Sequence, residues 1–107
     1  MTDRELLEKA AKAAGLAVII PAAHQRGLWI EGLEDEWNPL TDDGDALRLA
    51  VKLDMSLVMF SIFVRVDTVD YTDIYEEYGT DRYAATRRAI VRAAAQIGEH
   101  MEKQNGN

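Results

Sequence analysis

The chain contains no cysteine, which excludes disulfide bonds and thiolate metal sites and is compatible with a reducing cytosol. It also lacks any apolar run approaching the roughly 18 residues that a membrane-spanning helix needs. The first residues, MTDRELLEKAAKAAG, include acids and no apolar core, unlike a signal peptide. These absences predict a cytoplasmic protein with no membrane segment.

Basic residues are scarce: 12 lysines and arginines stand against 19 acids, and the net charge is −7. The deficit is concentrated between residues 31 and 81, where fourteen acids occur with only Arg48, Lys52 and Arg65. An acidic surface repels phosphate, so general nucleic-acid binding is disfavoured and a basic protein partner is favoured. The same charge also keeps a small protein soluble, so a purely solubilising role is the simpler alternative.

The 107 residues suffice for one modest core, and no repeat or linker divides them. Helical and alternating apolar patterns, with turn residues between them, predict the secondary structure. The expected helices cover 3–14, 43–53 and 82–101, and the expected strands cover 16–20, 28–32, 56–66 and 68–79. The order α-β-β-α-β-β-α predicts a single α+β domain over 1–107, with an antiparallel sheet packed against helices and a frayed tail at 102–107.

Two of the expected helices have informative apolar faces. The last helix predicts a buried stripe formed by Tyr83, Thr86, Ile90, Ala93, Ala94, Ile97 and Met101. The second helix is apolar over most of its circumference, so we expect it to be covered on more than one side. That cover is either the core of the fold or a partner subunit, and a homodimer is therefore possible.

Three acids, Asp42, Asp43 and Asp45, surround Gly44 at the start of the second helix. A calcium loop needs alternating acids and a closing glutamate, and neither Asp42 nor Asp43 as the first ligand gives that spacing. Helix capping makes fewer demands, because carboxylates accept the free N–H groups of a first turn. We therefore favour a cap, with a small metal-dependent enzyme at these three acids as an alternative.

Candidates for acid–base or nucleophilic catalysis are few. His24 is expected in a loop and His100 near the end of the last helix. Ser56 and Ser61 lie at the start of an expected strand and inside it, without the base and the acid that a catalytic serine needs in reach. The sequence therefore predicts no catalytic residue and no cofactor.

Two acidic segments form the expected partner-binding surface, because carboxylates beside aromatic rings suit a basic protein partner. Their residues are Glu34, Asp35, Glu36 and Trp37 in the first and Asp70, Asp73, Glu76 and Glu77 in the second. In a sharper form of this hypothesis, the acids imitate phosphate and occupy a basic nucleic-acid site. The alternative is a nucleic-acid-binding module in which Arg82, Arg88 and Arg92 contact phosphate, although such arginines often pair with nearby acids.

Two stretches, WNPLTDDGDALRLAVKL (37–53) and AATRRAIVRAAAQIG (84–98), resemble segments of small uncharacterised proteins of tailed bacteriophages and prophages, including the NinX-like group. They cover about a third of the chain, in its middle and at its end. The resemblance implies an accessory phage or prophage protein acting in the bacterial cytoplasm, and it implies no enzymatic activity. Our leading expectation is thus a non-catalytic protein that binds a host or phage macromolecule, most simply a protein.

Overall fold

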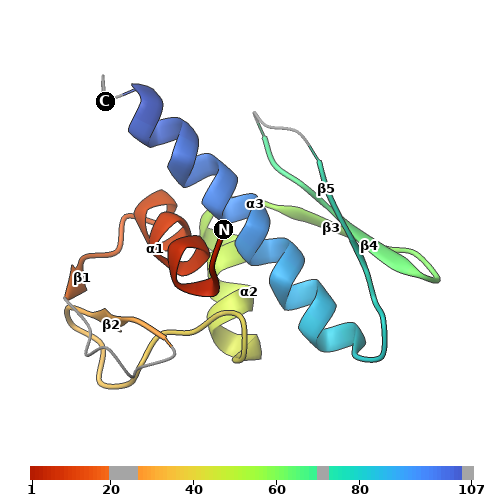
Figure 1. Cartoon of the computed structure of the whole chain (residues 1–107), viewed down its shortest axis with the longest axis horizontal. Helices are drawn as coiled ribbons and strands as arrows, with labels where there is room; N and C mark the ends of the chain where they lie inside the picture. The colour runs from red at the N-terminus through yellow and green to blue at the C-terminus, as the bar shows by residue number, and fades with distance from the viewer. Residues whose placement is uncertain (20–26, 70–72, 105–107) are drawn as a thin grey trace.

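The computed structural model describes residues 1–19, 27–69 and 73–104, and within these ranges it has three helices and two antiparallel sheets (Figure 1). The elements are α1 (Asp3–Ala13), β1 (Val18–Ile19), β2 (Trp29–Ile30), α2 (Asp43–Lys52), β3 (Ser56–Met59), β4 (Phe63–Asp67), β5 (Ile74–Glu77) and α3 (Arg82–Gln104). The predicted α+β class, with antiparallel strands packed against helices, is confirmed.

Helix α1 begins at a cap formed by Thr2. The Thr2 hydroxyl accepts the Glu5 N–H at 3.1 Å, and the Glu5 carboxylate accepts the Thr2 N–H at 3.2 Å. These reciprocal bonds satisfy two backbone donors that a helix start leaves without a partner. The Thr2 N–H and the Thr2 hydroxyl both donate to the Glu5 carboxylate, which lowers the pKa of Glu5 because these bonds favour its charged form.

Helix α3 is the centre of the fold: α1 and α2 pack on one side of it, and β4 and β5 pack on the other (Figure 1). Its buried residues therefore cover more of its circumference than the single predicted stripe. They are Ala85, Ala89, Ile90, Val91, Ala93, Ala94, Ala95 and Gly98. Tyr83, which the sequence places in the stripe, is 72 % exposed, because the first turn of α3 buries Ala85 instead.

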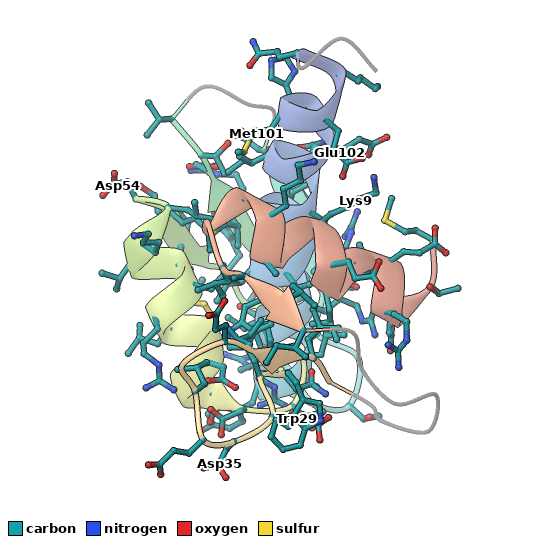
Figure 2. The ribbon with its side chains drawn as sticks, turned by 90° about the vertical axis from the view of Figure 1, so that its left-hand side faces the viewer. Lys9, Trp29, Asp35, Asp54, Met101 and Glu102 are labelled. Atoms are coloured by element: carbon teal, nitrogen blue, oxygen red, sulfur yellow. The ribbon has the colours of Figure 1, made fainter. Side chains whose placement is uncertain are left out.

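The C-terminal end of α3 is longer than predicted, because the helix continues to Gln104 rather than ending at Met101. Lys9 of α1 reaches this extension, and its Nζ lies 3.4 Å from Oε1 of Glu102 (Figure 2). Such a partly exposed pair contributes little energy, but it places α1 beside the last turns of α3. Residues 102–104 therefore belong to α3, whereas 105–107 lie outside the described residues, and the fraying of the tail stays a prediction.

Helices α1 and α3 come into backbone contact at Gly98. A Cβ added to Gly98 would overlap the Lys9 carbonyl group and would lie 2.8 Å from its carbon. On both helices the buried side chains near this point are small, among them Ala10, Ala11 and Ala94. Small side chains let two helix axes approach more closely than large ones do. The packing of α1 on α3 therefore depends on the missing side chain of Gly98.

The larger sheet has the order β3-β4-β5, and both neighbouring pairs are antiparallel. One long strand is predicted over 56–66, but the chain turns within this stretch and forms β3 and β4. The Phe60 N–H closes the turn on the Phe63 carbonyl oxygen at 2.9 Å. The prediction misses the turn because residues 60–62 contain no glycine, proline or asparagine to mark it. The acidic strand β5 lies at an edge of the sheet.

One face of this sheet packs on α3 through Val64, Val66 and Ile74, which are at most 8 % exposed. In the described part of the chain, no helix packs on the opposite face (Figure 1). That face carries the rings of Phe63 and Tyr75, whose centroids lie 5.8 Å apart. The sheet is therefore covered on one side only within these ranges.

Strands β1 and β2 are shorter than the predicted strands 16–20 and 28–32 and pair antiparallel as a hairpin, with Val18 opposite Ile30 and Ile19 opposite Trp29. The connection between them, which includes His24, lies outside the described residues. The hairpin lies on the far side of the helices from the larger sheet (Figure 1).

Helix α2 buries one face, formed by Ala46, Leu49 and Ala50. Leu47 and Val51 are 63 % and 68 % exposed, so no described element supplies the second cover that the sequence predicts. A partner subunit on this side of α2 stays a prediction.

Substitution Gly98→Ala should lower the free energy of unfolding by about 1–3 kcal/mol, because the added methyl group must push two helix backbones apart. Gly44→Ala is the matched control: Gly44 lies in the first turn of α2, where the nearest atoms belong to flexible side chains such as that of Arg48. Alanine is favoured at such a helix position by up to about 1 kcal/mol. Urea denaturation measures both variants, and a Gly98→Ala protein as stable as wild type would contradict the packing argument.

Candidate functional site

A hollow of about 1160 Å³, which we call the groove, lies between the end of α1, the segment 33–38 and α2. Its walls are Ala14, Gly15, Leu16, Leu33, Glu34, Asp35, Glu36, Trp37, Asn38, Thr41, Asp42, Asp45, Arg48, Leu49 and Lys52. Five carboxylates and two cations therefore share the lining with apolar residues. Leu16 and Leu33 form the accessible apolar part, which we call the floor, because Trp37 and Leu49 are buried. The groove is electronegative and can also accept an apolar side chain.

Backbone hydrogen bonds hold the segment 33–38 at its base. Leu28 and Trp37 form an isolated antiparallel bridge, with N–H to carbonyl distances of 2.9 and 2.7 Å. The Gly27 N–H donates to Oε1 of Glu36 beside this bridge. A Cβ on Gly27 would lie 2.6 Å from that oxygen and from the Trp37 carbonyl oxygen, so only glycine fits. The acidic loop is therefore closed where it meets the core.

The opposite wall starts at the cap of α2. The Asp42 carboxylate accepts the Asp45 N–H at 2.8 Å, which confirms the capping interpretation. Asp45 accepts the Asn38 N–H at 3.0 Å and the Arg48 guanidinium at 2.8 Å. These bonds join the end of the acidic loop to the first turn of α2.

The three acids of this cluster have three different partners. Asp42 caps α2 and Asp45 holds the backbone of Asn38, whereas Asp43 is bound by Arg87 of α3 at 2.6 Å. Within the described ranges, no group of three or more acids and histidines is arranged to hold a metal ion. The geometry gives the metal-enzyme alternative no support.

In the first acidic segment, Glu34 and Asp35 fit the predicted surface. Both are exposed, and neither has an ion pair or hydrogen bond with another described residue. Figure 2 shows Asp35 at the outer end of its loop, directed away from the fold. Glu36 is exposed, but Gly27 holds one of its oxygens. The prediction that Trp37 lies on the surface is corrected, because its side chain packs into the core and is 5 % exposed.

The second acidic segment lies with the larger sheet, on the other side of the helices (Figure 1). Asp73 and Glu77 are exposed, whereas Glu76 is half-buried and pairs with Arg92 at 2.7 Å. Neighbouring residues of a strand point to opposite faces, so Glu76 and Glu77 do not share one. Asp70 lies outside the described residues. The two acidic segments therefore do not form one continuous surface.

The arginines of the nucleic-acid alternative are engaged within the chain. Arg82 donates to a backbone carbonyl in the β3–β4 turn at 3.1 Å. Arg88 pairs with Asp3 at 3.1 Å, and Arg92 pairs with Glu76 on the acidic strand. Each paired acid reduces the positive potential that would attract phosphate. The structure therefore favours the intramolecular role for these arginines.

Comparison of the chain with protein-family models, with curated proteins and with solved structures finds no match. In the described ranges, no helix has the length and apolar character needed to cross a membrane.

Several groove residues carry no signal in the sequence. Leu16 follows the first helix, and Arg48 and Lys52 lie on the polar stripe of the second, so they come from distant parts of the chain. They meet only because α1 and α2 both pack on α3. A local signal in the sequence is the polar stretch before the cap of α2, which predicts a loop. It does not predict which element forms the other wall of the groove.

Substitution Asp42→Ala should lower the free energy of unfolding by about 1 kcal/mol, because the Asp45 N–H loses its cap. Asp42→Ser is the control, since a serine hydroxyl accepts the same N–H and should retain most of the stability. Urea denaturation compares the two variants.

Divalent cations should leave the melting temperature of the wild type unchanged. A rise in melting temperature that Asp42→Ser abolishes would restore the metal alternative.

The charge of Asp73 should make stability depend on pH. A side-chain hydrogen bond with Asp67, together with desolvation and the negative charge of Asp67, raises the pKa of Asp73, and Arg65 opposes this rise. The stabilisation that comes with a raised carboxyl pKa is present below the unfolded-state pKa and is lost as pH rises through the folded-state pKa. Asp73→Asn lacks the charge, so its melting temperature should exceed that of the wild type near neutral pH. Thermal melts at several pH values should show that the difference in melting temperature between Asp73→Asn and wild type disappears in acid. A lower melting temperature for Asp73→Asn near neutral pH would refute the unfavourable charge of Asp73.

Proposed function

We propose that the protein is a non-catalytic binding protein whose groove receives a positively charged, partly apolar segment of a protein partner. The observation that carries this proposal is the lining, in which five carboxylates and two cations lie with the apolar floor of Leu16 and Leu33. Glu34 and Asp35 have no partner among the described residues, so their charges are available to a ligand. A basic segment would therefore find unpaired carboxylates at the rim and apolar surface below them.

Both parts of the lining would contribute to binding in different ways. An apolar side chain placed on Leu16 and Leu33 would gain roughly 25 cal/mol for each Å² of apolar surface removed from water. The rim carboxylates would mainly raise the association rate and orient the ligand, because exposed charges act over the Debye length. Affinity would thus depend on the floor and selectivity for basic segments on the rim.

The chemistry of the lining favours binding over catalysis. Its residues supply carboxylates, an amide, a hydroxyl and two cations, but no imidazole or thiol. Asp42 and Asp45 already accept backbone N–H groups as a cap and as a loop anchor. The Thr41 hydroxyl donates to the Asn38 carbonyl oxygen at 3.4 Å, so it is engaged with the backbone rather than with a base.

The resemblance of 37–53 and 84–98 to proteins of tailed bacteriophages and prophages extends the proposal to a biological setting. The protein would be an accessory phage or prophage protein in the bacterial cytoplasm, and its partner a host or phage protein. The separation of the two acidic segments by the helices favours a short basic segment over imitation of a long row of phosphates.

Tryptophan fluorescence and amide NMR shifts would follow titration with a peptide that contains arginine and leucine. We expect shifts at the amides of 33–38 and at α2, with affinity that falls as salt rises. Glu34→Gln/Asp35→Asn should weaken binding by about three- to tenfold, because two exposed ion pairs are removed. Shifts confined to other surfaces, or binding indifferent to salt, would rule out the groove.

Glu8→Gln/Glu77→Gln is the matched control, because it removes the same charge from exposed residues of α1 and β5 outside the groove. Its affinity should stay within about twofold of wild type, since screened distant charges contribute little. The natural partner is tested by capture of bacterial lysate proteins on the wild type and on the same two double variants. The capture is repeated after nuclease digestion of the lysate. Capture that nuclease abolishes would instead support the nucleic-acid alternative.

A further inference from the structure

The two edges of the larger sheet differ in how they are protected. β5 carries Glu76 and Glu77 on one edge, and Arg92 of α3 donates to the Tyr75 carbonyl oxygen at 3.0 Å. Charged side chains and occupied carbonyl groups discourage the addition of another strand. This edge is therefore closed to strand pairing.

The other edge, β3, has neither form of protection within the described residues. No charged residue occurs between Asp54 and Arg65. The side chains of Leu57 and Met59 are 37 % and 51 % exposed. Apart from the ladder with β4, no hydrogen bond from a described element reaches the backbone of 56–59. An apolar, uncharged edge of this kind is a template for strand addition.

The register identifies the backbone groups that face outward. Phe60 donates its N–H to Phe63, and hydrogen-bonded and non-bonded pairs alternate along an antiparallel ladder. Val58 opposite Arg65 is therefore a bonded pair, whereas Leu57 opposite Val66 and Met59 opposite Val64 are not. The N–H and carbonyl groups of Leu57 and Met59 thus point to the open edge.

The side chains of these same residues are left half-covered by the fold. Leu57 and Met59 project on the α3 side of the sheet, because their cross-strand partners Val66 and Val64 are buried there. Helix α3 packs over β4 and β5 and leaves β3 beyond its cover. Apolar side chains and unpaired backbone groups therefore coincide on one strand.

We infer that the open edge of β3 is the interface between two copies of this chain, which pair their β3 strands antiparallel about a two-fold axis. The self-complementarity of an uncharged strand points to a second copy as the occupant, and the charge of the chain leaves β3 as a place where two copies can meet. Each copy carries a net charge of −7, so two copies repel except where carboxylates are absent, and β3 is such a place. A two-fold contact must also fit itself, and a strand with only serine, leucine, valine and methionine opposes no like charges.

The strand is short, so the contact is small compared with the roughly 1,200–2,000 Å² of a standard stable interface. The dimer should therefore dissociate on dilution. Sedimentation velocity over a concentration series measures this, and amide hydrogen exchange at the same concentrations locates the contact. Protection of the Leu57 and Met59 amides should rise with concentration, whereas the Val58 amide, bonded to β4, should be protected throughout.

Met59→Lys should raise the dissociation constant about tenfold or more, because the two-fold axis brings two like charges together. Leu47→Lys is the matched control on the exposed face of α2 and should leave association unchanged. Circular dichroism checks that both variants fold. If Met59→Lys does not fold, the concentration dependence of amide exchange in the wild type shows whether β3 is the interface. A protein that is monomeric throughout overturns the inference and leaves the edge to an extended segment of another protein. A dimer that Leu47→Lys disrupts, with Leu57 and Met59 amides that exchange alike at all concentrations, overturns it in favour of α2.

Discussion

The contact between the backbones of α1 and α3 at Gly98 is the constraint on which the arrangement of the other elements depends. It fixes the position of α1 on the central helix, and the end of α1 forms one wall of the groove. The opposite wall is held on the same helix by Arg87. This side chain donates to the carbonyl oxygen of Leu40, just before α2, and to the carboxylate of Asp43 in the first turn of α2. The width of the groove is thus set by two anchor points on α3.

The charged side chains divide into those that bind other parts of the fold and those that do not. Most arginines of α3 bind acids or carbonyl groups of α1, α2 and β5, so they act as links between the central helix and its neighbours. Several acids serve the same purpose from the other side, as caps or partners. What is left over is an excess of negative charge on loop 33–38 and on the outer face of the sheet. The net charge of −7 therefore says less about a partner than the few carboxylates that the fold does not use.

The sequence predicted the features that depend on interactions between residues close together in the chain. The caps of α1 and α2, the start of α3 at Arg82 and the α+β class follow from short-range patterns, and the structure has all of them. The turn at 60–62 was not predictable, because its residues read as a continuous strand and tertiary pairing with β5 decides the outcome. The groove was not predictable either, since its walls come from separate elements. The burial of Trp37 follows from its bridge to Leu28, which no local pattern indicates.

That bridge has a thermodynamic consequence for any ligand of the groove. Ordering a loop on binding costs conformational entropy, which reduces affinity for a given set of contacts. Here the segment between Leu28 and Trp37 is closed by two backbone bonds and by the Gly27 bond to Glu36 before any ligand arrives. The rim carboxylates are therefore preorganised, and folding rather than binding carries the cost of ordering them.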